Sequence, residues 1–155
     1  MNVIRSGHRI VYDSAAKATE SGTPTTPLEF ARRVRIAAGA VQLIKRGDVP
    51  RWYQWLAWFK FISHKLLRWL SPVLMCILLL SNAAIATHNG WYQVALYAQL
   101  AAYGLMLSAW SWTLFRTTRL GGIAFYFAFS QVAMMIGLCK GLFILQPSKW
   151  EKLAR

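Results

Sequence analysis

Acidic residues are almost missing from this chain of 155 residues. It holds five Asp and Glu against 18 Lys and Arg, which gives a formal net charge of +13. Residues 71–115 carry no charge of either sign, whereas residues 1–70 hold twelve Lys and Arg against four acids. A basic half beside an uncharged half favours contact with anionic lipid head groups or with phosphate ligands.

Other absences narrow the class of protein. The two cysteines, Cys76 and Cys139, lie inside apolar runs, so we expect neither a disulfide framework nor a cysteine metal site. Residues 1–20 carry charges throughout and lack an apolar core, so we expect no signal peptide and infer that the membrane segments direct insertion. Nucleic acid is the competing explanation for the basic charge. Because no nucleic-acid motif accompanies the charge, we expect no nucleic-acid partner.

Long apolar spans dominate the second half of the chain. The composition, 56% hydrophobic and 15% charged, is typical of a membrane protein. A membrane bundle is expected over 66–145, with spans at 66–86, 91–115 and 122–145. In the second span, two aromatic pairs stand about twenty residues apart, which is about 30 Å in a helix and matches the hydrocarbon core. The pairs are Trp91/Tyr92 and Trp110/Trp112. The sequence therefore predicts a mainly α protein with about three transmembrane helices.

Residues 1–24 are typical of the end of an α/β domain. Gly7 follows an expected helix end, since glycine tolerates the left-handed conformation found there. Short strands are expected at His8–Tyr12 and Ala16–Glu20. Two such strands cannot bury enough apolar surface to be stable alone. We therefore interpret residues 1–24 as a strand-and-loop stub on which something else packs.

A helix is expected over 25–47. Thr26 is the expected N-cap, followed by Pro27 and by Glu29 as the partner in a capping box, and Gly47 ends the helix. The helix carries three arginines in four residues. Two of them, Arg32 and Arg35, share one face. Two forked guanidinium groups on one face suit a diphosphate, whereas a basic helix resting on acidic lipids has the same spacing. Both interpretations stay open at this point.

An interface helix is expected over 51–65. Trp55, Trp58 and Phe59 recur at helical spacing, with Lys60 and Lys65 between and after them. Tryptophan combined with lysine is the pattern of a helix in the head-group region, and a soluble amphipathic helix is the alternative.

The bias of lysine and arginine predicts the orientation. Basic residues precede the first span and follow the second at Arg116 and Arg119, so the amino-terminal half and the 116–121 loop should be cytoplasmic. The predicted location is the inner (plasma) membrane, with a multi-pass topology. We favour a third full crossing, which places the basic tail 146–155 outside. A partly re-entrant last element would return the tail to the cytoplasm.

An ordered series of short motifs resembles one known family. The stretches GHRIVYDSAAKATE and PTTPLEFARRVRIAAG, from Gly7 to Gly39, resemble the end of the catalytic domain of membrane-bound family-2 glycosyltransferases. These include bacterial synthases of cellulose-like and hyaluronan-like polysaccharides. The family continues with a Gln-x-x-Arg-Trp helix, interface helices and a membrane bundle. The resemblance covers essentially the whole chain, including its ending KWEKLAR.

The resemblance implies roles for three residues. Arg35 stands at the Arg of the family motif and would contact the diphosphate of a nucleotide-sugar donor. Arg32 stands at the Gln and would shape the donor–acceptor region, and Glu20 would lie near the acceptor end of the pocket. Ile36 replaces the Trp and cannot stack on a sugar ring, so the resemblance implies glycosyl transfer without implying polymer synthesis.

The resemblance also implies a catalytic part beyond these residues. The family uses paired aspartates that hold Mg or Mn, and an acidic base, on a GT-A-like α/β domain. The five acids here form no close pair, so we expect no cofactor in this chain and no catalysis by the chain alone. The acids are Asp13, Glu20, Glu29, Asp48 and Glu151.

The expected partners are a nucleotide-sugar donor bound through the missing catalytic domain or through a separate catalytic chain, and anionic lipids. The alternative function is a free-standing small membrane protein that binds anionic lipid or phosphate as a structural or regulatory partner.

Polar residues within the spans allow two interpretations. Gln99 and Gln131 could line a path for a growing sugar chain, but we favour hydrogen bonds between neighbouring helices, because an unpaired amide is costly in a bilayer. Gly137 and Gly141 are four residues apart and permit close approach of another helix.

Overall fold

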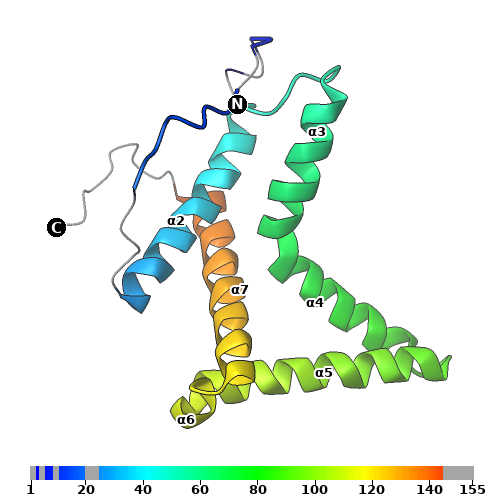
Figure 1. Cartoon of the computed structure of the whole chain (residues 1–155). Helices are drawn as coiled ribbons and strands as arrows, with labels where there is room; N and C mark the ends of the chain where they lie inside the picture. The colour runs from blue at the N-terminus through cyan, green and yellow to red at the C-terminus, as the bar shows by residue number, and fades with distance from the viewer. Residues whose placement is uncertain (1–2, 4–5, 9–10, 20–24, 145–155) are drawn as a thin grey trace. The chain divides into compact units, whose positions relative to one another are not determined.

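The computed structural model describes residues 3, 6–8, 11–19 and 25–144 (Figure 1). Of these residues 77% are helical, which confirms the predicted mainly α class. The described residues of the two expected strands, including Val11, Tyr12 and 16–19, are not in strands. Asp13 instead begins a turn, where its side chain accepts a hydrogen bond from the Ala15 amide at 2.9 Å. A strand needs a neighbouring strand for its backbone groups, and the described part of the chain contains none.

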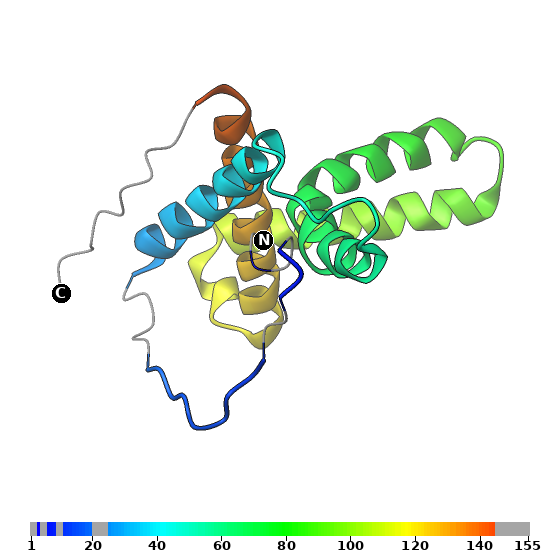
Figure 2. The same cartoon turned by 90° about the horizontal axis from the view of Figure 1, so that it is seen from above.

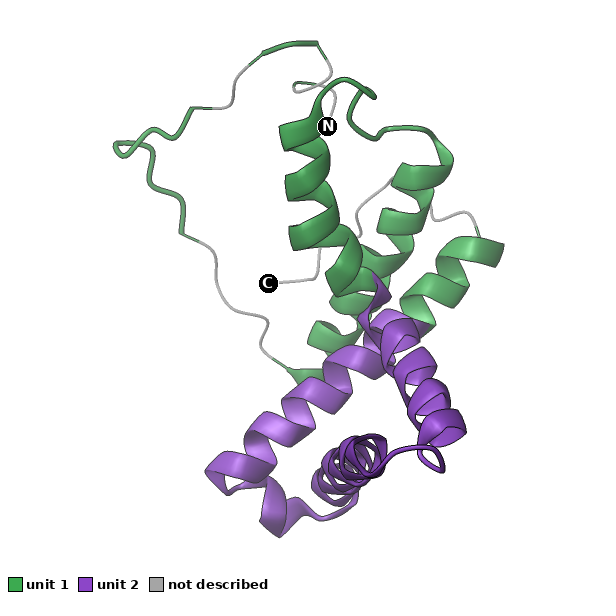
Figure 3. Cartoon of the chain, turned by 90° about the vertical axis from the view of Figure 1, so that its right-hand side faces the viewer, with its two compact units in different colours: residues 1–69, 136–155 green, residues 70–135 purple. Residues whose placement is uncertain are grey.

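The chain divides into two compact units, which Figure 3 colours separately. Unit 1 contains Met1–Trp69 and Ile136–Arg155, and unit 2 contains Leu70–Met135. Helices α4 and α7 each have one end in unit 1 and the remainder in unit 2. The membrane bundle predicted as one body over 66–145 therefore belongs partly to each unit.

Helix α2 (Thr26–Lys45) is the predicted arginine helix, but its first turn differs from the prediction. The N-cap is Thr25, and its side chain makes no capping hydrogen bond. The capping box does not form, because the Glu29 carboxylate pairs with arginines further along the helix. The carboxyl end is as predicted: Gly47 has φ +68°, and its amide donates to the Ile44 carbonyl at 2.9 Å.

Helix α2 packs through small residues on the carboxyl-terminal part of α7 (Arg119–Phe143), drawn in orange in Figure 1. A Cβ atom added at Gly137 would lie 2.5 Å from the Val34 carbonyl oxygen of α2. A Cβ atom added at Gly141 would lie 2.7 Å from the Ala38 carbonyl oxygen. Only glycine allows backbones this close, so the predicted role of the Gly137/Gly141 pair in close helix approach is confirmed.

The expected interface helix is shorter than predicted and is not separate from the first span. Helix α3 (Trp55–Phe61) passes through a π-helical turn, η1 (Ile62–Leu66), directly into α4 (Leu67–Ile85). One side of α3 is buried: Phe61 shares a core cluster with Ala40 of α2 and Trp69 of α4. The other side exposes Trp55 (71% exposed) and Phe59 (66% exposed). Such exposed aromatic residues fit a lipid head-group region better than water.

In unit 2, α4 and α5 (Gly90–Ser111) follow one another through a short turn (Figure 2). Asn89 caps α5 by accepting a hydrogen bond from the Trp91 amide at 3.0 Å. Helix α5 ends at Ser111, before the predicted end at residue 115, because Trp112 is extended with φ −111° and ψ 103°. A four-residue helix, α6 (Thr113–Arg116), then leads to α7.

Hydrogen bonds join the apolar helices of unit 2. Gln99 of α5 accepts from Asn82 Nδ2 of α4 at 3.0 Å, and its own amide donates to the Met75 carbonyl at 3.2 Å and to Tyr103 Oη at 2.7 Å. Gln131 of α7 accepts from Ser71 Oγ of α4 at 2.8 Å. The favoured interpretation of both glutamines, as hydrogen-bonding partners between helices, is thus confirmed.

Within the described residues, two helices are long and apolar enough to cross a membrane: the continuous helix Trp55–Ile85 and α7. These two helices coincide with the first and third predicted spans, and the prediction of about three transmembrane helices is not confirmed. Helix α5 has 22 residues, but its tyrosines, tryptophans and glutamines lower its hydropathy. The structure thus gives a mainly helical protein with two helices suited to a bilayer.

Candidate functional site

Two of the three arginines of α2 pair with a single carboxylate. Arg33 Nε donates to Glu29 Oε1 at 2.8 Å, and Arg32 Nη1 lies 3.6 Å from Glu29 Oε2. Arg35 lies further along α2 and is partly buried. The first turns of α2 therefore hold three guanidinium groups and one carboxylate.

The predicted site residues differ in their exposure and in their contacts. Arg32 is exposed, with 45% of its side-chain surface accessible, and is turned toward the helix start by Glu29. Arg35 lies about one helical turn further along, so both residues lie on α2 as predicted. The ion pairs of Glu29 with Arg32 and Arg33 were not expected. Its position three and four residues before Arg32 and Arg33 is the spacing at which helical ion pairs form. Glu20 lies outside the described residues.

Side chains from the end of α2 fix it to the last turn of α7. Lys45 Nζ donates to the carbonyl oxygens of Gly141 at 3.2 Å and Leu142 at 2.6 Å. Gln42, which is buried, donates to the Ile144 carbonyl at 3.3 Å. These carbonyls have no partner within α7, because the last turn of a helix lacks the amides that would bond them. A cation placed there also favours the negative end of the helix dipole. The arginines are therefore carried by a helix anchored at several points.

Within the described residues, no three His, Cys, Asp or Glu side chains lie close enough together to hold a metal ion. The donor set of a divalent-metal glycosyltransferase is therefore not found in this part of the chain.

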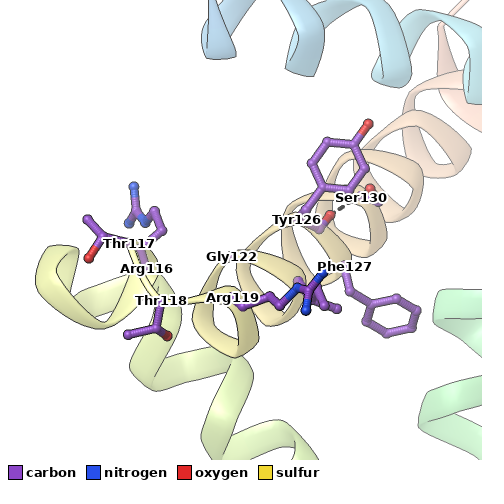
Figure 4. A pocket seen from close by; sticks show the side chains of 9 residues that line it. Arg116, Thr117, Thr118, Arg119, Gly122, Tyr126, Phe127 and Ser130 are labelled. Carbon is purple, nitrogen blue, oxygen red and sulfur yellow. Dashed lines mark hydrogen bonds between the residues drawn. The ribbon is translucent and has the colours of Figure 1, made fainter.

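A cavity of about 680 Å³ in unit 2 was not anticipated as a site from the sequence (Figure 4). It lies at the start of α7 and is lined by Arg116, Thr117, Thr118, Arg119, Gly122, Ile123, Tyr126, Phe127 and Ser130. In the sequence, Arg116 and Arg119 indicated only the orientation of the chain in the membrane. They are the only two charged residues between positions 70 and 135, and this isolation is the feature that could have marked them as a site.

The loop before α7 is fixed by Arg116 and Gly121. Arg116 donates to the carbonyls of Ala109 at 3.1 Å and Trp110 at 2.7 Å, at the end of α5. Its guanidinium carbon lies 3.8 Å from the centre of the Phe125 ring, in a cation–π contact. A Cβ atom at Gly121 would collide with the Phe115 carbonyl, so the chain requires glycine there. Arg116 is thus a structural residue that binds the end of α5 to the start of α7.

The comparisons with known proteins give no assignment: no protein family, no curated protein and no solved structure matches the chain.

Proposed function

We propose that this chain is the membrane portion of an inverting glycosyltransferase. The enzyme would move a sugar from a nucleotide-sugar donor to a saccharide or lipid acceptor in the synthesis of a cell-surface polysaccharide. The observation that carries the proposal is the anchored arginine helix. Arg32, Arg33 and Arg35 lie within about one turn of α2, and α2 packs by its small residues on α7, a helix suited to crossing a membrane.

In the proposed site, Arg35 contacts the diphosphate that leaves the donor sugar. Negative charge develops on this group as the bond to the anomeric carbon breaks, and a fixed guanidinium stabilises that charge with little reorganisation. Arg32 shapes the region between donor and acceptor, and Glu20 lies near the acceptor. Glu29 holds Arg32 and Arg33 through ion pairs and so limits the side-chain freedom that would be lost on ligand binding.

The remaining chemistry belongs to a catalytic part that this proposal requires. Inverting transfer needs a base near the attacking hydroxyl, and in the family that the sequence resembles, a divalent metal also binds the diphosphate. In this proposal the metal would bind to the catalytic part. The catalytic part is either a preceding domain or a separate chain.

We also propose that α4 and α7 cross the inner membrane while α5 does not. The start of α4 and the end of α7 belong to one compact unit: Trp69 packs with Ala40 of α2, and Lys45 of α2 binds the carbonyls of Gly141 and Leu142. Two segments of one folded unit cannot lie on opposite faces of a bilayer, so the number of crossings between them is even. The two helices apolar enough to cross supply that number.

This topology places both ends of the chain on the cytoplasmic face. The amino-terminal half, the tail and Lys140 near the end of α7 then hold every lysine and arginine except Arg116 and Arg119, which agrees with the positive-inside rule. The loop around Arg116 lies on the outer face, in contrast to the cytoplasmic 116–121 loop expected from the sequence. Helix α5, with aromatic residues near both ends, lies near the outer head-group region.

A second candidate is the free-standing membrane protein that binds anionic lipid or phosphate. The ion pairs of Glu29 favour it, because partial compensation of charge within a helix is typical of a solvated basic helix. The two candidates differ in what must accompany the chain. The glycosyltransferase needs a catalytic part, and the free-standing protein does not.

The first experiment is to read the DNA upstream of the codon for Met1. The glycosyltransferase proposal predicts coding sequence for an α/β domain with paired aspartates, either in frame or in a neighbouring gene. The restored enzyme with Arg35→Ala should then turn over donor 10²- to 10³-fold more slowly, as is usual when a group that stabilises the transition state is removed. Arg46→Ala, at the other end of α2, is the matched control and should keep normal turnover. A promoter and ribosome-binding site with no such domain nearby would favour the second candidate.

A further inference from the structure

The cavity at the start of α7 carries an inference that goes beyond glycosyl transfer. We propose that it binds the head group of an anionic membrane lipid and that Arg119 is the cation that contacts the lipid phosphate. The proposal rests on the membrane placement of α7 but not on the arginines of α2.

Charge is the first argument. Unit 2 contains only two charged side chains, Arg116 and Arg119, and no acid occurs in the sequence between Asp48 and Glu151. A guanidinium beside apolar helices is unfavourable without an anion, because the low dielectric there penalises an unpaired charge. Unit 2 offers no carboxylate to pair with Arg119, and lipid phosphate is the anion at a membrane surface.

The two arginines of unit 2, Arg116 and Arg119, have different surroundings. Arg116 is engaged with the carbonyls of Ala109 and Trp110 and with the ring of Phe125. Arg119 is exposed, and its side chain makes no hydrogen bond or ion pair with any residue that the structure describes. In Figure 4 its side chain extends along the first turns of α7 toward Phe127. Its whole forked guanidinium is available for two parallel hydrogen bonds to a phosphate group.

The third argument is the lining and size of the cavity. Hydroxyl groups of Thr117, Thr118, Tyr126 and Ser130 lie among its lining residues, together with the apolar side chains of Ile123 and Phe127. Thr117 and Thr118 lie beside Arg119 at the start of α7, and Ile123 and Phe127 lie one and two turns further along. Ser130, furthest along, donates its hydroxyl to the Tyr126 carbonyl at 2.7 Å. A charged group followed by apolar side chains matches a lipid, whose phosphate leads into an acyl chain. The volume of about 680 Å³ lies within the usual range of ligand cavities, roughly 300–1,000 Å³.

The length of α7 indicates the depth of Arg119 in the membrane. Helix α7 has 25 residues, so at about 1.5 Å per residue it is about 37 Å long, slightly more than the hydrocarbon core of about 30 Å. Arg119 is its first residue and therefore lies at the level of the head groups on either choice of orientation. A free phosphate would use the same guanidinium but would gain nothing from Ile123 and Phe127, because it has no apolar part.

The test is native mass spectrometry of the full chain with bound lipid. Phosphatidylglycerol is titrated against the wild-type protein and against Arg119→Gln, Arg119→Lys and Lys140→Gln. The last variant removes the same charge from the other end of α7. We expect Arg119→Gln to weaken phosphatidylglycerol binding about tenfold, Arg119→Lys to weaken it less, and Lys140→Gln to change it less than twofold. Equal effects of Arg119→Gln and Lys140→Gln would overturn the proposal, because binding would then follow net charge alone.

Two further arms identify the ligand. Phosphatidylcholine, which carries no net charge, should bind the wild-type protein and Arg119→Gln equally weakly. Inorganic phosphate at millimolar concentration should not displace phosphatidylglycerol, and displacement would show that a free anion, and not a lipid, occupies the cavity. Ile123→Asn alters the apolar wall and keeps Arg119, so unchanged lipid binding by this variant would also contradict a lipid occupant. The donor turnover of Arg35→Ala does not depend on any of these lipid-binding measurements. Failure of the lipid proposal would therefore not contradict the glycosyltransferase proposal, and the reverse also holds.

Discussion

Gly137 of α7 lies so close to Ala37 of α2 that a Cβ atom added at Gly137 would be 2.5 Å from the Ala37 Cβ. Gly141 makes a similar approach one turn later, where an added Cβ would lie 2.8 Å from the Val41 Cβ. The two glycines form the surface on which the arginine helix rests.

Replacing Gly137 by alanine should therefore separate α2 from α7. Overpacking of this kind costs about 1–3 kcal/mol, which we expect as a lower free energy of unfolding and faster proteolysis within α2. Gly104→Ala is the matched control, because a Cβ atom at Gly104 of α5 meets nothing within 4 Å. The control should be neutral or slightly stabilising, since alanine is the better helix former. Equal stability of the two variants would contradict the close packing of α2 on α7.

The hydrogen bonds of Gln99 should contribute to the stability of the α4–α5 pair. Gln99→Leu removes its bonds to Asn82, Met75 and Tyr103, and we expect a loss of about 1–2 kcal/mol, because hydrogen bonds between membrane helices are individually modest. Chemical denaturation in detergent measures this loss. Gln93→Leu, at an exposed position near the start of α5, is the control and should leave stability within about 0.5 kcal/mol. A loss no larger than that of the control would show that Gln99 has a different role.

Labelling of single cysteines tests the proposed topology. In a background with Cys76→Ala and Cys139→Ala, the variant Thr117→Cys should react with a membrane-impermeant maleimide added outside the cell. With two crossings, the loop at Thr117 lies outside, whereas three crossings place it in the cytoplasm. Thr87→Cys, in the turn after α4, should react from outside in either case. Ser6→Cys should react only after the cells are broken. Protection of Thr117→Cys in intact cells would refute the two-crossing arrangement.

Local signals in the sequence predicted the helices well. Gly47 ends α2 in the left-handed conformation as expected, and Gly7 has φ +82° where a helix stop was predicted. The apolar runs located α4, α5 and α7 to within a few residues at most ends. These features depend on neighbours in sequence, and so their chemistry is visible in the sequence itself.

Features that depend on contacts distant in the sequence were less predictable. No break separates the interface helix from the first span, because the backbone stays helical through the π-helical turn Ile62–Leu66. The hydrogen bonds from Lys45 to the end of α7 join residues about a hundred positions apart, and no local pattern marks them. They are also the contacts that argue for an even number of crossings.

The arginine site was predictable in part. The position of Arg32 and Arg35 on one helix followed from spacing alone, and the structure has both on α2. The role of Glu29 was wrongly predicted, because a carboxylate in the first turn of a helix can either cap the backbone or pair with arginines three and four residues later. The ion pairs prevail here, with Arg33 Nε at 2.8 Å. The function of Arg35 stays a prediction.

The inhibition of donor turnover by nucleoside diphosphate, measured in membranes that contain the restored enzyme, tests the central claim most directly. If Arg35 holds the leaving diphosphate, Arg35→Ala should raise the inhibition constant of the diphosphate at least tenfold. The same change should affect inhibition by the nucleoside monophosphate much less, because the monophosphate lacks the group that Arg35 contacts. Arg46→Ala should leave both constants unchanged. If Arg35→Ala leaves the diphosphate inhibition constant and the turnover unchanged, the arginine helix does not bind the leaving group, and the proposed function is wrong.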